Sequence, residues 1–455
     1  MSDQYFELPG FAGSLFHPDH ADYDTHRKVY NGMIDRRPAV IARCSSPDDV
    51  ILAIALAQAK GLPLSVFGGG HAVTGTAVCD QGVCIDLRGM KRIDIDPAAR
   101  TARVEAGANW GEFDAATSAH GLAMTGGRNP TTGVAGLTVG SGSGWLERKF
   151  GYVCDNLLKA EVVTADGRKV IASESENLDL FWGLRGGGGN FGIVTAFHFR
   201  LHPLPPALLG GVLLYPAPMA AAVLKNFRDF MQTAPDEVGG GMVFTTAPDA
   251  PFVPPPARGQ PVAMVQLVYA GDPEEGARVL APLRAFGPPA ADLLQPTPYP
   301  VLQTQGGNFP GIQNYWTADF LNQLPDEAID AYAQLALTPI SPQSAIIMVA
   351  GGGAPSRVAE EATAFGMRTA PWNVHYICGW TDPADNARNI ERVKAAASVL
   401  KPWATGRVYL NYIGDEGQAR IESSFGPEKL ARLRELKARW DPQNVFRHNQ
   451  NIRPA

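Results

Sequence analysis

Apolar and polar residues near the start of the chain follow a strand, helix, strand pattern. The run AVIARC is apolar and β-branched, VILAIALAQAK is typical of a helix, and LPLSVF is again typical of a strand. Ser46 and Pro47 are start signals for the helix, and Gly61 is a stop signal. The pattern over residues 39–67 therefore predicts a second strand that leads directly into a run of three glycines.

Short strand patterns and a second capped helix follow. The runs VCIDL, RIDID and ARVEAG are typical of strands. Asn109 can cap a helix over WGEFDAATSAH, with Glu112 completing the capping box and Gly121 as the stop. AEVVTADGRKVIA predicts a hairpin that turns at Asp166-Gly167. Beyond it, the helical run DLFWGLR precedes the strand pattern IVTAFHF.

The character of the chain changes after Pro203, because residues 203–300 are rich in proline. Strand patterns (VAMVQLVYAG, AIIMVAGGG, NVHYICGW) then mix with helical ones (PMAAAVLKNFRDFMQ, ADNARNIERVKAAASVL). This mixture predicts an α+β fold, with an antiparallel sheet flanked by helices. We expect the chain to divide into residues 1–205, a middle domain of residues 206–400, and a C-terminal segment of residues 401–455.

Composition and charge exclude several classes of protein. With 45% hydrophobic residues, 18% charged residues and a net charge of −6 without a basic run, we expect a soluble globular protein that binds neither nucleic acid nor membranes. The start of the chain lacks the pattern of a secretory signal, and no apolar run is long enough for a membrane span. The five cysteines form no CxxC pair, so we expect reduced thiols, no metal site and a cytoplasmic location.

Three glycine-rich segments, residues 68–70, 133–144 and 186–192, carry the main candidate chemistry. The third fits GxGxxG, but its helix precedes and its strand follows, the reverse of the order that a dinucleotide-binding fingerprint needs. Glycine-rich turns expose backbone N–H groups that can bind phosphate oxygens. Three such segments in one region predict a single long ligand that carries a diphosphate.

His71 directly follows the first glycine run, in VFGGGHAVTG. The residue can be a core histidine, a metal ligand or a covalent attachment point. No HxH or HxxxH pattern lies near it, which disfavours a metal. Residue chemistry leaves core packing and covalent attachment both open.

The motifs together resemble the flavoprotein family of vanillyl-alcohol oxidase and berberine-bridge-enzyme type, near the bacterial branch that contains 6-hydroxy-D-nicotine oxidase. Residues 39–202 and 405–453 carry the resemblance. It rests, in order, on GGGHAVTG, GLTVGSGSGWLERKFGYVCDNL, TADGRKV, DLFWGLRGGGGNFGIVTAFHF, YLNY and KARWDPQNVFRHNQNI. The resemblance implies a two-part FAD-binding domain of the PCMH type, to which residues 401–455 return, and a separate substrate domain.

Site residues follow from the resemblance. His71 matches the histidine that is bonded to the 8α-methyl group of FAD, and Asn129 stands where doubly linked members have a cysteine, so a single covalent bond is implied. The resemblance also implies FAD contacts from Gly68, Gly69, Gly70, Gly75, Thr132, Gly133, Gly136, Gly140, Gly142, Gly144, Asp155, Asn156, Gly192, Val194, Asn411, Asn449 and Gln450.

The implied reaction oxidises an alcohol or amine by hydride transfer to flavin N5, with O₂ as acceptor and H₂O₂ as product. Tyr412, in a YxNY strand, is the expected base, and a base of this type needs a nearby cation or donors to lower its pKa. We expect Tyr409 and His375 to assist it; simple packing is the alternative role for these side chains. The predicted substrate residues are Asn308, Tyr315, Trp316 and Asn373.

Two departures from the family pattern leave other functions open. Thr132 places a hydroxyl where a small apolar residue commonly gates oxygen, which leaves an oxygenase or a dehydrogenase open. Asn373 stands where berberine-type members often have a glutamate, which leaves a flavin- or ligand-binding protein without turnover open. The expected partners are a small-molecule substrate and O₂, and a homodimer stays open.

Overall fold

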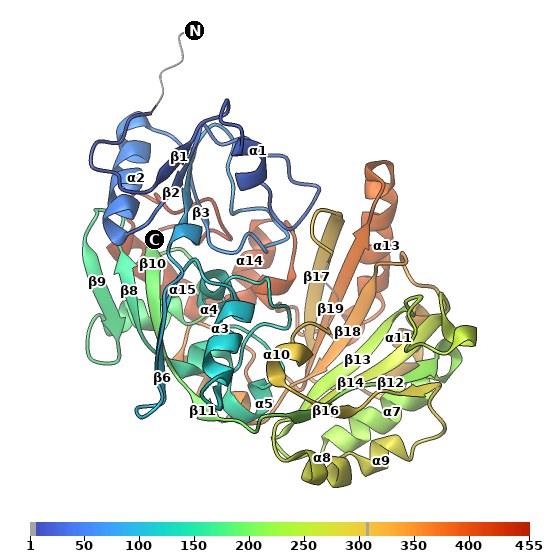
Figure 1. Ribbon diagram of the computed structural model, residues 1–455. Coiled ribbons are helices and arrows are strands. Elements are labelled where there is room, and N and C mark those ends of the chain that lie inside the picture. Colours follow the sequence, from blue (N-terminus) through green and yellow to red (C-terminus); the bar gives the residue numbers. More distant parts are fainter. Residues whose placement is uncertain (1–5, 306–308) are drawn as a thin grey trace.

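The computed structural model describes residues 6–305 and 309–455. Figure 1 shows two parts. The first part contains a four-stranded and a five-stranded sheet together with the C-terminal helices, a two-stranded sheet pairs β11 (His202–Pro203) with β7 (Leu122–Ala123), and the second part contains one large antiparallel sheet with its own helices. Helices and mixed sheets confirm the predicted α+β class.

A four-stranded sheet opens the first part, in the order β1 (Ser14–Phe16), β2 (Val40–Arg43), β4 (Val83–Asp86), β3 (Leu64–Phe67). The predicted strand, helix, strand unit is confirmed, because α2 (Pro47–Lys60) connects β2 to β3. Ser46 Oγ accepts the backbone N–H of Asp49, and Gly61 ends the helix with a φ of 62°. Strand β3 then leads into the first glycine run.

The second sheet of the first part is antiparallel, in the order β5 (Ile93–Asp96), β6 (Thr101–Glu105), β10 (Ile193–Arg200), β8 (Leu157–Val163), β9 (Lys169–Ser173). Strands β8 and β9 form the predicted hairpin, with Gly167 at a φ of 78° in its turn. As predicted, α3 (Trp110–Ser118) begins at a capping box of Asn109 and Glu112, and α6 (Leu178–Leu184) precedes β10.

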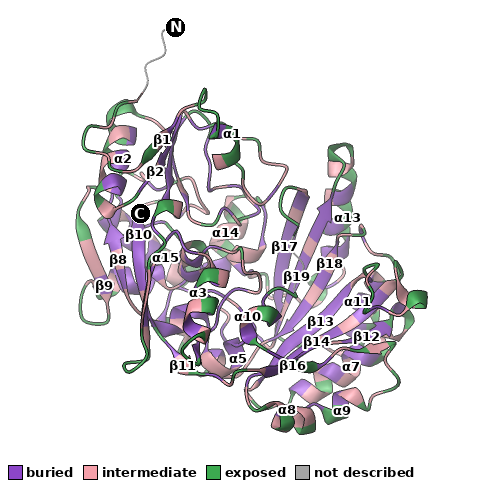
Figure 2. Cartoon of the chain, in the orientation of Figure 1, coloured by how far each residue is buried: buried purple, intermediate pink, exposed green. Residues whose placement is uncertain are grey.

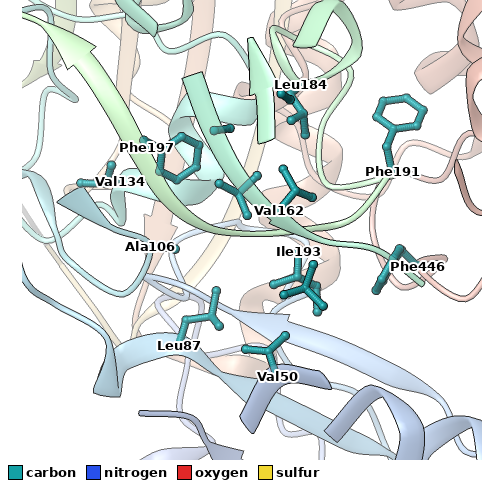
Figure 3. Packing of buried hydrophobic residues seen from close by; sticks show 14 of the residues in the cluster. Val50, Leu87, Ala106, Val134, Val162, Leu184, Phe191, Ile193, Phe197 and Phe446 are labelled. Atoms are coloured by element: carbon teal, nitrogen blue, oxygen red, sulfur yellow. The ribbon is translucent and has the colours of Figure 1, made fainter. Parts of the chain in front are cut away.

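One hydrophobic core lies between these two sheets (Figure 3). Val50 of α2 and Val162 of β8 both belong to it, so the core joins elements of both sheets. Helix α15 (Pro427–Trp440) adds Leu433 and Leu436 to the same core. Full burial of one such side chain stabilises the fold by about 1.5–3 kcal/mol. The C-terminal segment is therefore held against the N-terminal half of the chain.

The second part is built on an eight-stranded sheet whose paired strands are all antiparallel. Its order is β15 (Ala291–Asp292), β12 (Leu208–Pro216), β14 (Pro261–Tyr269), β13 (Val238–Thr246), β18 (Ala345–Ala350), β19 (Trp372–Trp380), β17 (Gln313–Leu321), with β16 (Gln295–Thr297) also paired to β12. Figure 2 shows its central strands largely in the colour of buried residues.

The two faces of this sheet differ. Helices α7 (Ala220–Met231), α11 (Asp326–Ala333) and α13 (Asn386–Ser398) share one hydrophobic cluster with the inner residues of one face, Val374 and Tyr376 among them. Side chains alternate along a strand, so Asn373 and His375 of β19 point to the other face. That face turns toward the first part, where the backbone of Trp145 leaves no room for a Cβ at Gly239.

The segment YLNY is a 3₁₀ turn rather than the predicted strand. The backbone N–H of Tyr412 donates to the carbonyl of Tyr409 at 2.9 Å. In a 3₁₀ turn, residues three apart lie on the same side, and the rings of Tyr409 and Tyr412 meet edge to face with centroids 4.5 Å apart. A strand would have separated the two rings, so the turn brings both tyrosines to one place.

Short elements complete the fold: α1 (Tyr23–His26), β7 (Leu122–Ala123), α4 (Val134–Val139), α5 (Glu147–Phe150), β11 (His202–Pro203), α8 (Pro273–Val279), α9 (Ala281–Arg284), α10 (Tyr299–Leu302), α12 (Ala354–Arg357) and α14 (Gln418–Phe425). Among residues 6–305 and 309–455, no helix has the length and apolar character that a membrane crossing needs. The same residues contain no group of three or more His, Cys, Asp or Glu side chains that could hold a metal ion. All five cysteines are buried free thiols.

Candidate active site

His71 follows the glycine run at the end of β3. Its ring stacks on Tyr30, with centroids 4.1 Å apart, and lies 6.3 Å from the ring of Trp316. Burial lowers the pKa of His71 to about 4, so the imidazole is neutral at physiological pH. Its Nε2 atom is buried and has no hydrogen-bond partner in the described part of the chain. Buried polar atoms are normally hydrogen-bonded, so this nitrogen points to a ligand.

The three glycine-rich segments form one continuous surface. A Cβ on Gly69 would collide with the backbone of Gly133, so the first and second segments touch through their backbones. The carbonyl of Val139 accepts the N–H groups of Gly186 at 3.1 Å and Gly188 at 2.9 Å, which joins the second segment to the third. The tertiary fold therefore brings together the three segments that the sequence separates.

This surface has the features that a diphosphate needs. The backbone N–H groups of residues 69–72 donate no hydrogen bond to any described residue. A Cβ on Gly136 or Gly189 would meet no atom within 4 Å, so space lies open beside the backbone there. Unpaired N–H groups beside open space form an anion-binding concavity. Together with the unpartnered Nε2 of His71, these features fit FAD.

Other glycines named by the sequence make contacts within the protein. Gly75 has a φ of 67°, and a side chain there would collide with Ile34. A side chain on Gly140 would collide with the amide group of Asn411. Gly70, Gly144 and Gly192 would likewise place a Cβ against Phe67, Gly126 and Val162, whereas a Cβ on Gly68 would make only an ordinary contact with Ala135. These positions shape the turns that hold the surface in place.

Asp155 and Asn156 also bond to protein groups. The Asp155 carboxylate accepts two bonds from Arg368, the shorter at 2.7 Å, and this pair is almost fully buried. The Asn156 amide donates to the carbonyls of Phe150 at 2.9 Å and Tyr152 at 3.0 Å. The two side chains thus fix the loop after α5.

The C-terminal residues Asn449 and Gln450 join distant segments. The amide of Asn449 donates to the carbonyl of Gly189 at 3.1 Å, and that of Gln450 donates to the carbonyl of Leu410 at 2.7 Å. These bonds tie the third glycine segment and the tyrosine turn to the chain end. Val194 is buried in β10, and Thr132 is half-buried.

Three other predicted residues, Trp316, His375 and Tyr412, lie together on the face of the eight-stranded sheet that turns toward the first part. The rings of His375 and Tyr412 stack with centroids 3.9 Å apart and an interplanar angle of 1°. Trp316 of β17 meets His375 edge to face at 5.4 Å. Burial, reinforced by the positive charge of Arg128, lowers the pKa of His375 to about 3, and its Nε2 has no partner among the described residues.

Arg128 is one residue of this candidate site that the sequence analysis missed. Its guanidinium donates to the Tyr412 hydroxyl at 2.8 Å and to Ser143 Oγ at 2.7 Å, and it lies 3.4 Å from the Glu147 carboxylate. A cation that donates a hydrogen bond to a phenol oxygen stabilises the phenolate. The expected base needed such a cation, and Arg128 directly precedes Asn129, so a search for basic residues in that motif could have found it.

Tyr409 has a different environment from Tyr412. Its hydroxyl accepts the backbone N–H groups of Gly142 at 2.9 Å and Ser143 at 3.0 Å, and the amide of Asn411 at 3.0 Å. Burial raises the pKa of Tyr409 well above its ordinary value. Tyr409 therefore anchors the second glycine segment to the tyrosine turn.

The remaining predicted substrate residues do not lie together: Asn373 and Tyr315 are on opposite faces of the sheet. Asn373 faces the first part, and its Oδ1 atom is buried without a partner in the described chain. Tyr315 belongs to the hydrophobic cluster on the helix-covered face of the sheet, and burial raises its pKa to about 12. The structure thus does not bring Tyr315 to Trp316 and His375. Asn308 lies outside the described residues.

A surface that fits FAD, facing a tyrosine beside a cation, defines a class of protein: a flavin-dependent oxidoreductase. Comparison with protein-family models agrees. Residues 38–173 match the model described as FAD binding domain, and residues 408–453, which contain the tyrosine turn, match the one described as berberine and berberine like.

Full-length relatives and solved structures share this organisation. The (R)-6-hydroxynicotine oxidase of Paenarthrobacter nicotinovorans is 30% identical over 100% of this chain and 99% of its own length. The crystal structure of 6-hydroxy-D-nicotine oxidase from Arthrobacter nicotinovorans has a TM-score of 0.88 at 28% identity, covering 98% of each chain. A berberine-bridge-enzyme-like protein of Physcomitrella patens has the same fold, with a TM-score of 0.86 at 24% identity and 96% of each chain covered. The chain belongs to the berberine-bridge-enzyme-like family and is an FAD-linked oxidoreductase.

Proposed function

We propose that this enzyme oxidises the C–H bond of an alcohol or amine on a small molecule, and that O₂ is its electron acceptor and H₂O₂ its product. The observation that carries the proposal is the 2.8 Å hydrogen bond from Arg128 to the hydroxyl of Tyr412. The ring of Tyr412 also stacks on the ring of His375, which belongs to strand β19 of the large sheet. FAD, when bound, supplies the acceptor for the hydride and passes the electron pair to O₂.

Tyr412 is the proposed base. Oxidation of an alcohol carbon to a carbonyl removes a hydride from carbon and a proton from oxygen, and the phenolate oxygen of Tyr412 takes that proton. Arg128 donates a hydrogen bond to this oxygen at 2.8 Å, and Ser143 Oγ, 3.3 Å from the same oxygen, is a second polar contact. The neutral His375 ring holds the Tyr412 ring in its orientation by stacking.

His71 is the proposed attachment point of FAD, through a single bond to the 8α carbon. The support is its Nε2 atom, which is neutral, buried and unpartnered at the end of the glycine surface. The other predicted FAD residues divide into two roles. The N–H groups of residues 69–72 and the open backbone at Gly136 would contact the cofactor, whereas Asp155, Asn156 and Gly75 would hold the surrounding loops.

The attachment is tested by acid precipitation of the purified protein, followed by filtration. We expect the yellow colour to stay with the wild-type polypeptide. In His71→Ala, the colour should pass through the filter or be absent. His375→Ala is the matched control, because it removes a histidine of the same site and should keep the flavin attached. Colour that stays with His71→Ala would contradict the proposed bond.

A second experiment tests whether O₂ is the electron acceptor, independently of how FAD is attached. Photoreduced enzyme mixed with O₂ should reoxidise quickly and release one H₂O₂ per flavin. Thr132 stands beside the first glycine segment, and Thr132→Val should change the rate of reoxidation without changing the rate of reduction. Slow reoxidation by O₂ combined with fast reoxidation by an artificial dye would instead identify a dehydrogenase.

A further inference from the structure

The hydroxyl of Tyr412 carries a proton of its own, which has to leave before the oxygen can accept a proton from a substrate. The Tyr412 hydroxyl donates to Ser143 Oγ at 3.3 Å, and Ser143 Oγ donates to Oε2 of Glu147 at 2.5 Å. Each hydroxyl is the donor to the next group, and a carboxylate, which has only acceptor atoms, ends the series. The hydrogen bonds therefore run in one direction, from the proposed base to Glu147.

The backbone fixes the position of this series. Ser143 and Glu147 belong to one turn, in which the N–H of Gly144 donates to Glu147 Oε2 at 2.8 Å. A Cβ on Gly144 would collide with the carbonyl of Gly126, so the turn packs directly on the segment that carries Arg128. Since the two segments are in backbone contact, the fold itself sets the distances from Glu147 to Ser143 and to Arg128.

Arg128 contacts both ends of the series. Its Nη1 atom donates to the Tyr412 hydroxyl at 2.8 Å, and its Nη2 atom lies 3.4 Å from Oε1 of Glu147. When one proton moves from Tyr412 to Glu147, the negative charge moves the other way, and the same guanidinium faces it before and after. Because an unpaired buried charge is costly, a shared cation lowers the free energy of this transfer.

Other groups near Tyr412 are poorer acceptors of its proton. Arg128 has no acceptor atom. Burial, together with the positive charge of Arg128, lowers the pKa of His375 to about 3, so its ring takes up no proton at neutral pH. The Tyr409 hydroxyl already accepts three N–H groups, and burial raises its pKa. Among the residues that the structure describes, Glu147 is the carboxylate that hydrogen bonds connect to Tyr412.

A hollow of about 10 Å³ lies beside the Glu147 carboxylate, which is enough for about one water molecule. Ser143, Glu147 and Asn373 are polar residues that line it. The Oδ1 atom of Asn373 is buried and has no partner in the described chain, so a water molecule would find several polar groups there. Such a water can take the proton from Glu147 and restore the carboxylate for the next turnover.

We propose that Ser143 and Glu147 form a proton relay that serves Tyr412. The O–H bond of Tyr412 breaks and its proton bonds to Ser143 Oγ, while the original proton of Ser143 passes to Glu147 Oε2. The products are a phenolate, an unchanged serine and a carboxylic acid, and no electrons are gained or lost. The phenolate then accepts the substrate proton. This inference rests on the proposed function, in which Tyr412 is the base.

Glu147→Gln tests the relay, because glutamine keeps an acceptor oxygen that cannot take up the proton. The assay is anaerobic stopped-flow bleaching of the holoenzyme at neutral pH by benzyl alcohol, benzylamine or D-glucose, whichever bleaches the wild-type flavin fastest. We expect the limiting rate of reduction to fall by about 10–10²-fold and the apparent Kd of the probe to stay unchanged. Glu176→Gln makes the same change at an exposed residue outside the site and should leave the rate unaltered.

Ser143→Ala interrupts the relay at its middle and should slow reduction as much as Glu147→Gln does. The double variant should be no slower than either single one, since all three lack the same relay. Ser143→Thr keeps the hydroxyl and should recover most of the rate. A role limited to holding Arg128 in place predicts no effect of Glu147→Gln in an Arg128→Met protein, whereas the relay predicts a further loss there.

Two further measurements do not depend on the rate. Thermal unfolding and the flavin-to-protein absorbance ratio identify any variant that fails to fold, and comparison of Ser143→Ala with Ser143→Thr tests the relay without changing the carboxylate. Time-resolved infrared spectra during reduction should show the C=O band of a protonated carboxyl group in the wild type and lose it in Glu147→Gln. A band that is absent from the wild type, or that persists in the variant, would overturn the inference.

A wild-type limiting rate in Glu147→Gln would also overturn the inference. So would a loss confined to the Kd, a double variant whose loss is the product of the two single losses, Ser143→Thr as slow as Ser143→Ala, or no further loss in the Arg128→Met protein. Tyr412→Phe in the same assay separates the relay from the proposed function. Slow reduction in Tyr412→Phe with a wild-type rate in Glu147→Gln refutes the relay alone. A wild-type rate in Tyr412→Phe, or bleaching of the wild type by none of the probes, contradicts the proposed function and the relay with it.

Discussion

The two walls of this candidate active site are made from different parts of the polypeptide. The first part presents backbone: the N–H groups of residues 69–72 have no partner among the described residues, and open space lies beside Gly136 and Gly189. The sheet of the second part presents side chains, among them Asn373 Oδ1 and His375 Nε2, which have no hydrogen-bond partner in the part of the chain that the structure describes. Backbone groups are the same in every residue and suit an invariant cofactor. Side chains differ from position to position and suit a particular substrate.

Arg128 and the tyrosine turn connect the two walls. Arg128 lies in the first part, 284 positions before Tyr412, and yet bonds to its hydroxyl. Tyr409, three residues from Tyr412, bonds instead to the backbone of the second glycine segment. Tyr409 therefore bonds to the wall that we propose for the cofactor, and Tyr412 lies beside the wall that we propose for the substrate. The predictions below separate these roles, from the largest expected effect to the smallest.

Tyr412→Phe should have the largest effect. It removes the proposed base and leaves the ring stack, so we expect flavin reduction by substrate to slow by about 10²–10⁴-fold. The measurement is anaerobic stopped-flow absorbance with a substrate that bleaches the wild-type flavin. Tyr409→Phe is the matched control: it should lower thermal stability, because two backbone N–H groups lose their acceptor. A Tyr412→Phe enzyme that bleaches at the wild-type rate would exclude this residue as the base.

Arg128→Met should slow flavin reduction by about 10²-fold, because the oxygen of Tyr412 loses its charged donor. Arg128→Lys keeps the charge and should recover part of the loss, which a purely structural role of the guanidinium would not predict. The measurement compares the limiting rate of reduction with the apparent Kd of the substrate. A change confined to the Kd would show that Arg128 binds substrate instead of supporting the base.

Gly69→Ala and Gly136→Ala test the backbone wall. A Cβ on Gly69 would collide with the backbone of Gly133, and we expect a loss of about 1–3 kcal/mol in stability. A Cβ on Gly136 meets no described atom, and alanine favours the helix α4, so the fold should be unharmed. Thermal unfolding and the flavin-to-protein absorbance ratio measure both effects. If Gly136 contacts the cofactor, its variant should lose flavin while it keeps its stability.

The pH dependence of stability should differ in sign between the two parts. In the first part, burial raises the pKa of Asp114 from 3.8 to about 7, so its contribution to stability is present below pH 3.8 and is lost as the pH rises through 7. In the sheet, burial lowers the pKa of His375 from 6.5 to about 3, so its contribution is present above pH 6.5 and is lost as the pH falls toward 3.

Asp114→Asn should therefore gain in Tm relative to the wild type as the pH rises from 4 to 8, by a few degrees. His375→Gln should gain relative to the wild type as the pH falls from 6.5 to 4. Thermal unfolding across this range measures both differences. Parallel curves for the wild type and either variant would show that the buried group does not titrate on folding.

Local signals in the sequence predicted much of the fold. The capped helix after Ser46, the capping box at Asn109 and the hairpin at Gly167 were all correct, because each depends on residues within a few positions of one another. The YLNY segment was predicted as a strand and is a turn. The Tyr409 hydroxyl and the Asn411 amide of this segment bond to the second glycine segment. The alternation of apolar and polar side chains along the sequence does not indicate such distant partners. The domain boundaries near residues 205 and 400 stay predictions.

The sequence by itself predicted a ligand that carries a diphosphate, because glycine-rich turns are short strings whose chemistry is local, and its resemblance to a flavoprotein family implied that this ligand is a flavin. Only the tertiary structure decided that Arg128 reaches Tyr412, that Tyr409 anchors a glycine segment, and that Tyr315 faces away from Trp316. These pairings depend on how the two parts of the molecule pack together. That packing is set by the summed burial of many apolar side chains, which no single motif encodes.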